Sequence, residues 1–289
     1  MNIIAGTELI LTPENKIYHL NLSKEEIADD IILVGDPARV VLISSKFDTI
    51  EYKIQNREFV THTGTLNGKR ISAIATGIGP DNIDIVINEL DALVNIDFET
   101  RTINKTKKKL NLIRLGTSGS LQRNIDVDTF LASSYGLGFD GLAHFYQNKE
   151  LLEQKMGNAY TVHANWPVNL ATPYFIKASE CLLERFPELA HGITATAPGF
   201  YAPQGRALRL KPAISDLHEK MKTFRYKEKK ICNFEMETSA FYYLGQTLGH
   251  NTLTICAVIG NRLTKEYSKE HKKPIEKMIN LALNRICLQ

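Results

Sequence analysis

The hydrophobic pattern of the chain switches repeatedly between two periods. Short runs of β-branched and other apolar residues alternate with segments in which apolar residues recur every three or four positions. The runs predict strands, and the second pattern predicts amphipathic helices. Several runs are apolar throughout, as expected of strands that are covered on both faces. The six predicted strands are Ile31–Val34, Arg70–Thr76, Leu110–Leu115, Thr129–Ser134, Gly192–Thr196 and Thr252–Ile259.

Three amphipathic helices are predicted between and after these strands. The apolar stripe of the first begins after Asp81 and ends at Val94. The second covers residues 236–248, and Gly249 follows at the position where glycine commonly ends a helix. Pro274 opens the third, because proline suits the start of a helix. Strands that alternate with helices in this way are typical of an α/β fold.

Two polar segments interrupt the pattern, at Asn95–Lys109 and Lys220–Lys230. Both carry several lysines, which could form basic patches, but no aromatic residue lies among the basic residues of the first, Arg101 to Lys109. Solvated loops are therefore the favoured interpretation of both. Neither segment is rich in proline, glycine or serine, and no internal repeat is visible. We therefore expect one domain over residues 1–289.

Composition narrows the function classes. The 289 residues are 43% hydrophobic and 23% charged, which is ordinary for a globular protein. A formal net charge of +3 is too small to predict nucleic-acid binding. No apolar run approaches the length of a membrane span, and Met1–Thr12 holds no basic region of a signal peptide. The four cysteines show no zinc-site spacing, so we expect reduced thiols and a cytoplasmic protein, with Cys256 buried in its apolar run.

Two strand ends carry residues suited to an anion. After Val34 the chain turns through Gly35 and Pro37, and Arg39 adds a forked cation near the free N–H groups of a new helix. A tight turn with a surface arginine is the alternative.

Arg114 stands in an otherwise apolar strand before a Gly/Thr/Ser loop that includes Thr117. A charge there is costly unless it is paired or faces a ligand, so a phosphate site or a structural ion pair is indicated.

Two further segments suit a base and a sugar. Gln204 offers a donor and an acceptor, Arg206 only donors, and Phe200 an apolar wall, a set that matches a pyrimidine edge. A polar surface turn is the alternative. Glu237 lies before a helix, where it could accept both hydroxyls of a ribose or simply favour the helix dipole. The Gly77–Gly79 turn does not have the dinucleotide-binding spacing, and close packing alone would explain it.

Taken in order, these pieces resemble the nucleoside phosphorylase-I family, and within it the uridine phosphorylases. Each motif is weak, but the ordered set, which spans residues 18–262, is specific. The motifs are Gly-Asp-Pro-x-Arg from Gly35, Arg-Glu-Phe from Arg57, Thr-Gly-Ile-Gly from Thr76, Arg-x-Gly-Thr-Ser-Gly from Arg114, Phe-Tyr and Gln-x-Arg from Phe200 to Arg206, Glu-Met-Glu from Glu235, and Asn-Arg at Asn261.

The resemblance implies an α/β/α sandwich around a mixed, barrel-like central sheet, assembled as homodimers or trimers of dimers. It implies that uridine and inorganic phosphate, a co-substrate, give uracil and ribose 1-phosphate with no cofactor. The implied phosphate ligands are Gly35, Arg39, Arg114 and Thr117, with Arg57 from a neighbouring subunit. The implied ribose ligands are Met236 and Glu237, with His19 from across the interface, and the implied uracil ligands are Phe200, Gln204 and Arg206.

The mechanism that follows needs neither a protein nucleophile nor a catalytic metal. Phosphate attacks C1′ while the ribose becomes oxocarbenium-like, so three arginines position the nucleophile, and Gln204 and Arg206 stabilise the departing uracil. In some relatives a monovalent cation such as K⁺ binds at the positions of Glu58, Ile78 and Asn82. The chain departs from the usual pattern in the turn Gly79–Asn82, where relatives often have a second glycine and then Pro-Ser. It also departs at Pro203, where glycine is usual, and in Asn95–Lys109, which looks like an insertion.

Three other functions are compatible with parts of the pattern. A purine nucleoside phosphorylase would place a catalytic aspartate after the last strand, but residues 257–262 contain no acid. A nucleosidase that uses water would lack Arg39, Arg57 and Arg114. A non-catalytic nucleoside-binding protein on the same fold could keep every site residue. A nucleic-acid-binding role has no recognised motif to support it.

Overall fold

The structure, a computed structural model, describes residues 3–288, and all six predicted strands form within that range. They are β1 (Asp30–Val34), β4 (Lys69–Ala75), β7 (Asn111–Ser120), β8 (Phe130–Gly138), β10 (Ala190–Thr196) and β13 (Asn251–Asn261). Two of them extend well beyond the predicted ends. Strand β7 continues through the Gly/Thr/Ser segment that was expected to be a loop, because it pairs with β13 along its whole length.

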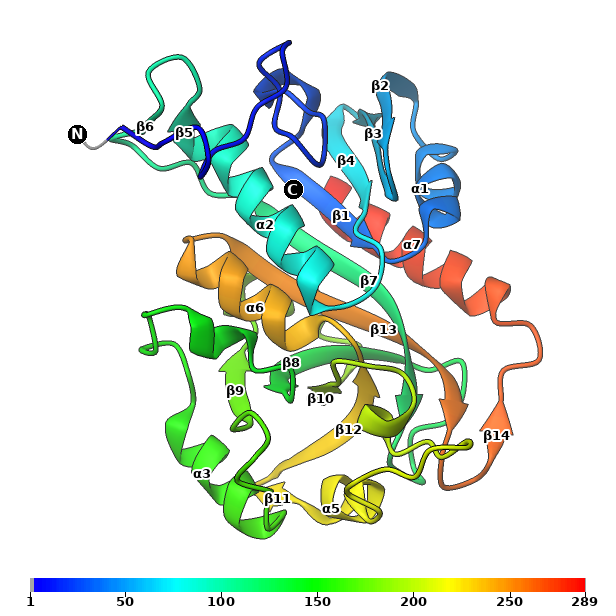
Figure 1. Ribbon diagram of the computed structural model, residues 1–289. Helices are drawn as coiled ribbons and strands as arrows, with labels where there is room; N and C mark the ends of the chain where they lie inside the picture. Colours follow the sequence, from blue (N-terminus) through cyan, green and yellow to red (C-terminus); the bar gives the residue numbers. More distant parts are fainter. Residues whose placement is uncertain (1–2, 289) are drawn as a thin grey trace.

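Five strands close into a mixed barrel. The order is β7, β13, β8, β10 and β12 (Lys229–Glu235), and the ring closes because Asn233 and Phe234 of β12 pair with Ser120 and Gly119 of β7. Parallel and antiparallel pairs alternate irregularly around it. The extended sheet continues from β7 through β1 and β4 to the hairpin of β2 (Thr49–Asn56) and β3 (Phe59–Leu66). The expected mixed, barrel-like α/β fold is therefore present (Figure 1).

Several strands carry no clear sequence pattern. The outer strand β2 is exposed or half-buried at every position, and β3 is buried but contains Thr61, His62 and Thr63. Polar residues therefore hide the hydrophobic pattern by which either strand could be predicted. In the structure, the hydroxyl groups of Thr63 and of the neighbouring Ser72 form a hydrogen bond of 2.7 Å. The short strands β9 (Tyr174–Lys177), β11 (Arg225–Tyr226) and β14 (Glu266–Tyr267) add to β8, β12 and β13 respectively.

Helices cover both faces of the sheet. Helices α2 (Pro80–Asn95) and α6 (Thr238–Thr247) pack against each other on one face (Figure 1). Helices α1 (Pro37–Ser44) and α7 (Lys272–Cys287) lie together on the other, where Lys46 and Glu276 form an ion pair at 2.8 Å. The remaining helices are α3 (Gln154–His163), α4 (Glu180–Leu183) and α5 (Leu217–Thr223), with 3₁₀ turns at Lys24–Glu26, Leu142–Phe145 and Ala202–Gln204.

The three predicted helices are confirmed, with one shifted start. The left-handed backbone that favours glycine is found where expected, at Gly249, which has a φ of 91° just after α6. Helix α7 begins at Lys272 rather than at Pro274. The N–H groups in the first turn of a helix have no intrahelical acceptor. A proline, which lacks the N–H, therefore destabilises the helix little at any position of that turn and does not mark its first residue.

Both polar segments contain structure that the sequence analysis assigned to loops. Asn95–Lys109 includes a small hairpin of β5 (Ile96–Asp97) and β6 (Thr102–Ile103). Its turn residue Arg101 donates hydrogen bonds to the carbonyls of Ile4, Ala5 and Leu9, so the hairpin holds the N-terminal segment. Lys220–Lys230 overlaps α5, β11 and β12. In both segments the backbone forms local hydrogen bonds while the lysines stay at the surface. The segments therefore have no periodic pattern of apolar residues from which these elements could be predicted.

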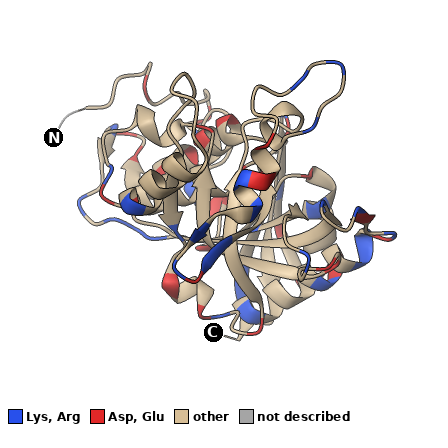
Figure 2. Cartoon of the chain, turned by 90° about the horizontal axis from the view of Figure 1, so that it is seen from below, with Lys and Arg blue, Asp and Glu red and all other residues tan. Residues whose placement is uncertain are grey.

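Within residues 3–288, no helix is both long and apolar enough to cross a membrane. Positive and negative residues are interspersed over the cartoon in Figure 2 rather than separated onto two faces. All four cysteines are free, and Cys256 is fully buried as expected.

Candidate active site

Strand β1 and helix α1 flank the first candidate segment, as the sequence predicts. Asp36 caps α1 by accepting a hydrogen bond from Ala38 N at 2.9 Å, and Pro37 occupies the first helical position. A side chain at Gly35 would meet the carbonyl of Gly77 at 3.2 Å and the guanidinium of Arg114 at 3.9 Å. The Arg39 guanidinium reaches across and donates to the carbonyl of Leu115 at 3.2 Å.

These residues form an electropositive corner, defined here as Gly35, Arg39, Gly77 and Arg114 and called the arginine corner. Burial lowers the pKa of Arg39, and the nearby positive charge of Arg114 lowers it further. Two guanidinium groups so placed repel each other, and an anion between them would relieve the repulsion. Thr117 is half-buried and directly follows Gly116, whose small size leaves room for the Arg114 guanidinium.

Arg114 is buried together with two carboxylates. Its guanidinium is in direct contact with Glu237 and lies 3.4 Å from Glu235, and all three side chains are about 5% exposed or less. Burial alone would lower the pKa of Arg114, but Glu237 and Glu235 outweigh it and the pKa is raised. The sequence left open a phosphate site or a structural ion pair at this position, and the structure contains the ion pair.

The two carboxylates have different surroundings. Glu235 accepts hydrogen bonds from the backbone N–H groups of Glu237 and Thr238 and from the hydroxyl of Thr196. Within the described part of the chain, Glu237 accepts only from Arg114 and from the N–H of Gly79, the latter at 2.9 Å. Burial and the charge of Glu235 raise the pKa of Glu237 to about 7, despite the opposing effect of Arg114. One arginine therefore faces two acids, and burial beside a second carboxylate favours the protonated form of Glu237.

The glycine turn places that N–H group. Gly77 and Gly79 have φ values of 71° and 101°, which other residues rarely adopt. The turn delivers Gly79 to the start of α2 and directs its N–H at Glu237, 158 positions later in the chain. The simpler interpretation of this turn was close packing alone. The turn in addition donates a hydrogen bond to a candidate site residue, Glu237. Met236 lies half-buried between the two acids.

The loop at residues 199–206 forms a second group. Arg206 lies over the ring of Phe200 at 3.7 Å and donates both to the carbonyl of Phe200 and to the side chain of Gln204. Gln204 is 3% exposed, so this loop is more than a surface turn. Burial, followed by the charge of Arg262, lowers the pKa of Arg206 to about 10. Pro203 lies in the 3₁₀ turn that buries Gln204.

Comparisons with known proteins identify the family of the chain. The model of the phosphorylase superfamily matches residues 29–287. The uridine phosphorylase of Thermococcus kodakarensis is 30% identical over 91% of this chain and 83% of its own. The DeoD-type purine nucleoside phosphorylase of Brevibacillus brevis is 29% identical over 92% of this chain and 97% of its own. A Trypanosoma brucei nucleoside phosphorylase with uridine phosphorylase activity superposes with a TM-score of 0.84 at 26% identity, covering 96% of this chain and 99% of that one.

The chain belongs to the phosphorylase superfamily. At the level that its relatives share it is a nucleoside phosphorylase, a pentosyltransferase that binds a nucleoside and phosphate. The relatives divide between uridine and purine enzymes at similar identity, so the base is not decided by likeness.

Three residues without an assigned role in the sequence analysis complete the 199–206 loop of the phosphorylase. The Phe234 ring lies 5.6 Å from both the Arg206 and the Arg262 guanidinium groups. His218 Nε2 donates to the carbonyl of Gln204 at 2.6 Å and holds the loop from outside. Phe234 packs on Gly119, five residues along β7 from Arg114, so one strand connects the loop to the arginine corner. The Asn-Arg and Glu-Met-Glu motifs were the only sequence signals for these contacts.

Two predicted residues lie apart from the arginine corner. Arg57 is exposed at the turn between β2 and β3 and lies 5.5 Å from the ring of Tyr18. His19 follows Tyr18 and contacts Glu89 of α2, with 2.6 Å between Nδ1 and Oε1. No contact within residues 3–288 links either side chain to Arg39 or Arg114. This position is compatible with the expectation that both residues serve a neighbouring subunit.

The three residues considered for a monovalent cation do gather around Gly77. Asn82 Nδ2 lies 3.5 Å from the carbonyl of Ile78, and the Glu58 side chain borders the space in front of Gly77. Glu58 and Ile78 are exposed. Among the described residues, no group of three or more His, Cys, Asp or Glu could hold a metal ion by itself.

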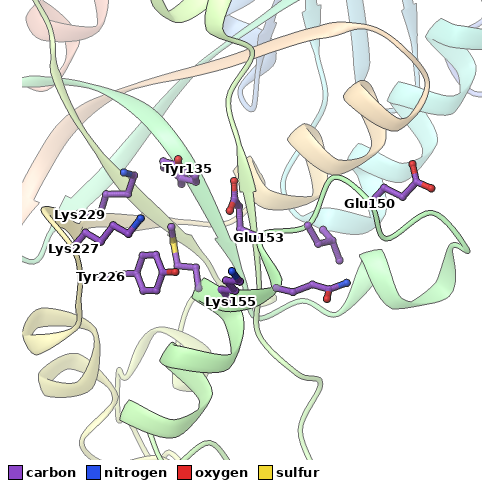
Figure 3. A pocket seen from close by; sticks show the side chains of 10 residues that line it. Tyr135, Glu150, Glu153, Lys155, Tyr226, Lys227 and Lys229 are labelled. Carbon is purple, nitrogen blue, oxygen red and sulfur yellow. The ribbon is translucent and has the colours of Figure 1, made fainter.

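A separate hollow of about 450 Å³ lies between the start of α3 and the β11–β12 hairpin (Figure 3). Tyr135, Glu153, Lys155, Tyr226 and Lys229 are among its lining residues, and it shares none with the predicted site. The candidate site of the phosphorylase is therefore defined by residue contacts and not by this hollow.

Proposed function

We propose that the protein is a uridine phosphorylase, which converts uridine and inorganic phosphate to uracil and ribose 1-phosphate. The observation that carries the pyrimidine assignment is the state of Asn261, at the end of β13. Its amide group donates to the carbonyls of Gln122 and Ile125, and its Oδ1 accepts from the N–H groups of Leu263 and Thr264. The purine enzymes considered above place an acid after this strand to protonate the departing base, whereas this side chain is a neutral amide whose hydrogen bonds are made to the backbone.

The electrostatics of the 199–206 loop support the same proposal. Uracil leaves with negative charge, and Arg206 and Arg262 provide two cations beside Phe234. Gln204 and Arg206 would read the base edge, with Phe200 as an apolar wall. Burial of Gln204 raises the cost of a mismatched base, because its polar groups would be left unpaired.

The remaining roles follow from the arginine corner and its carboxylates. Gly35, Arg39, Arg114 and Thr117 would hold phosphate, joined by Arg57 of a second copy, and Met236 and Glu237 would hold the ribose, joined by His19 of a second copy. Phosphate forms its bond to C1′ as the bond from C1′ to uracil N1 breaks, and the electron pair leaves with uracil. The protein's contribution is position and charge, with no covalent intermediate.

The proposal also covers the oligomeric state, a bound cation and the cellular compartment. We infer one domain and a dimer, or a trimer of dimers, in which sites are shared. Glu58, the Ile78 carbonyl and Asn82 form a candidate K⁺ site, with phosphate and nucleoside the only other small-molecule partners. The four free cysteines support a reducing compartment, the cytoplasm.

An assay of base release decides the function. Uridine, deoxyuridine, thymidine, cytidine, inosine and adenosine are incubated with the enzyme, with and without phosphate. We expect uracil from uridine only when phosphate is present. Equal release without phosphate would identify a hydrolase, and release from inosine at the rate of uridine would contradict the pyrimidine assignment. Binding without turnover would favour the non-catalytic alternative.

A further inference from the structure

The turn that carries the proposed base ligands contains one peptide that is free to rotate. The N–H groups of Gln204 and Arg206 both donate to the carbonyl of Tyr201, at 3.0 and 2.8 Å, and that of Gly205 donates to the carbonyl of Ala202 at 2.9 Å. Gly205 has a φ of 67°, a left-handed conformation that glycine leaves easily because it tolerates either sign of φ. The peptide between Gln204 and Gly205 can therefore rotate unless its carbonyl is held.

His218, the second residue of α5, holds that carbonyl. Its Nε2 atom lies 2.6 Å from the backbone oxygen of Gln204. A side chain at Gly205 would meet the imidazole at 2.9 Å, so the ring also fills the space beside the glycine. The imidazole centroid lies 5.9 Å from that of the Phe234 ring, which also neighbours the Arg206 guanidinium. His218 therefore contacts the loop at its glycine, where the backbone can rotate.

The surroundings favour the neutral imidazole. Burial lowers the pKa of His218, and the charges of Arg262 and Arg206 lower it further, against the opposing effects of the hydrogen bond to Gln204 and of Glu219. A neutral imidazole has a single N–H group, and a carbonyl oxygen can only accept. The hydrogen is therefore on Nε2, and the bond to Gln204 does not depend on a charge that would repel the two arginines.

We propose that His218 is a positioning residue for the base: by holding the carbonyl of Gln204, it keeps the side chains of Gln204 and Arg206 in the arrangement that receives uracil. The inference rests on the proposed function. Rotation of the 204–205 peptide would break the hydrogen bond from Gly205 to Ala202 and would displace both side chains. An enzyme in which this carbonyl is free must order the loop each time a nucleoside binds, and that cost lowers its apparent affinity. The same cost applies to the Michaelis complex and to the transition state, so KM rises while kcat stays unchanged.

The test compares two replacements that differ in hydrogen-bonding capacity. His218→Phe keeps an aromatic ring beside Phe234 but has no donor, whereas the amide of His218→Gln can donate to the same carbonyl. In His218→Phe we expect KM for uridine to rise about tenfold, as for the loss of one hydrogen bond, with kcat and KM for phosphate within about twofold of the wild type. His218→Gln should restore KM for uridine to within about threefold of the wild type. Partial unfolding would instead reduce the amount of active enzyme, and so lower kcat with both KM values unchanged. If His218→Phe does not fold, His218→Ala, which adds no bulk, takes its place with the same expectation.

The chain offers a matched control at the C-terminal half of α5. His163 Nε2 lies 3.0 Å from the carbonyl of Lys220, and its ring packs edge-on against that of Phe224, with 5.4 Å between the ring centroids. His163 therefore makes the same two kinds of contact, but with a carbonyl of α5 and not with one of the 199–206 loop. His163→Phe should leave kcat and both KM values within about twofold of the wild type. A rise in KM for uridine in this variant as large as in His218→Phe would overturn the inference, and so would a failure of His218→Gln to restore that KM.

A measurement without turnover separates this inference from the proposed function. Hydrogen exchange followed by mass spectrometry reports how often the amides of Gly205 and Arg206 lose their hydrogen bonds. In the peptide that contains them we expect faster exchange for His218→Phe, and wild-type exchange for His218→Gln and His163→Phe. Unchanged exchange in His218→Phe would overturn the inference even if uridine is cleaved. If no nucleoside is cleaved, the proposed function fails, and the exchange rates still decide whether His218 holds the loop.

Discussion

The guanidinium of Arg114 and the carboxylate of Glu237 are in direct contact inside the protein, although 123 positions separate them in the chain. Glu235 faces the same guanidinium, so two carboxylates share one buried cation. The residue expected to hold phosphate and the residue expected to hold ribose therefore form a single electrostatic unit. A change in protonation or charge at one of these two residues should therefore change the electrostatic environment of the other.

The first prediction is a pH dependence of nucleoside binding. Glu237 accepts ribose hydroxyls best as a carboxylate, and its pKa is raised to about 7 by burial and by Glu235. As the pH falls below about 7 the carboxyl group gains a proton, so the KM for uridine should rise while KM for phosphate changes less. Initial rates between pH 5.5 and 8.5 measure this. Glu237→Gln should have a weak but pH-independent KM, and an unchanged slope in that variant would assign the titration elsewhere.

The second prediction concerns the nucleophile. Arg39 is a better probe than Arg114, because removing Arg114 would leave two buried carboxylates uncompensated, at a cost of about 3–5 kcal/mol in folding free energy. Among the described residues, the Arg39 guanidinium makes a single hydrogen bond, to the carbonyl of Leu115. Arg39→Ala should fold and should lower kcat/KM for phosphate by about 100-fold or more. An exposed arginine without a site role, Arg123→Ala, is the control. Equal phosphate constants in the two variants would remove Arg39 from the site.

The third prediction tests shared sites. Arg57 lies with Tyr18, away from Arg39, and no contact within residues 3–288 joins them. Arg57→Ala and Arg39→Ala should each be nearly inactive, yet a mixed dimer contains one site with both arginines. Unfolding and refolding the two variants together should restore about a quarter of wild-type activity, because random pairing makes half of the dimers mixed and each has one intact site. Full activity of a strictly monomeric preparation would contradict the assignment of Arg57.

The sequence predicted the local turns around the candidate residues better than the contacts between them. Strand, glycine and proline in succession are local signals, so the turn at Gly35 and the position of Arg39 on α1 followed directly from pattern. The contact of Arg114 with Glu237 depends on which strands neighbour each other, and no local period encodes that. Strand β7 was predicted too short for the same reason, because the partner that keeps Gly116–Ser120 extended is β13. Arg101 and Glu89, which hold the N-terminal segment, lie in stretches where polar residues are unremarkable.

The fourth prediction concerns base recognition. Gln204 is buried and is held by Arg206 and by the bond from His218 to its carbonyl. If it reads the uracil edge, Gln204→Ala should cost about 2–4 kcal/mol in kcat/KM for uridine. Gln246→Ala is the control, since the side chain of that glutamine also makes a hydrogen bond, to the carbonyl of Lys177 at 2.7 Å, but belongs to α6 and not to the loop. Similar small losses in both variants would reduce the 199–206 loop to a structural turn.

The last prediction concerns the exchange of the Asn261 amide for a carboxyl group and its effect on purine cleavage. Asn261→Asp supplies the acid that the purine reaction needs, with almost no change in size. The structure argues against a gain of function, because the Asn261 Nδ2 atom donates to the carbonyls of Gln122 and Ile125 at 3.0 and 2.9 Å. An aspartate there can donate at most one hydrogen bond, and only when protonated, so at least one of these two hydrogen bonds is lost. We expect a loss of about 1–3 kcal/mol in the free energy of unfolding, measured with urea, and no inosine cleavage. Asn67→Asp, at an exposed turn, should change stability by less than about 0.5 kcal/mol. Rapid inosine phosphorolysis by Asn261→Asp would show instead that the side chain can leave the backbone and reach a base, and that Asn261 alone excludes purines.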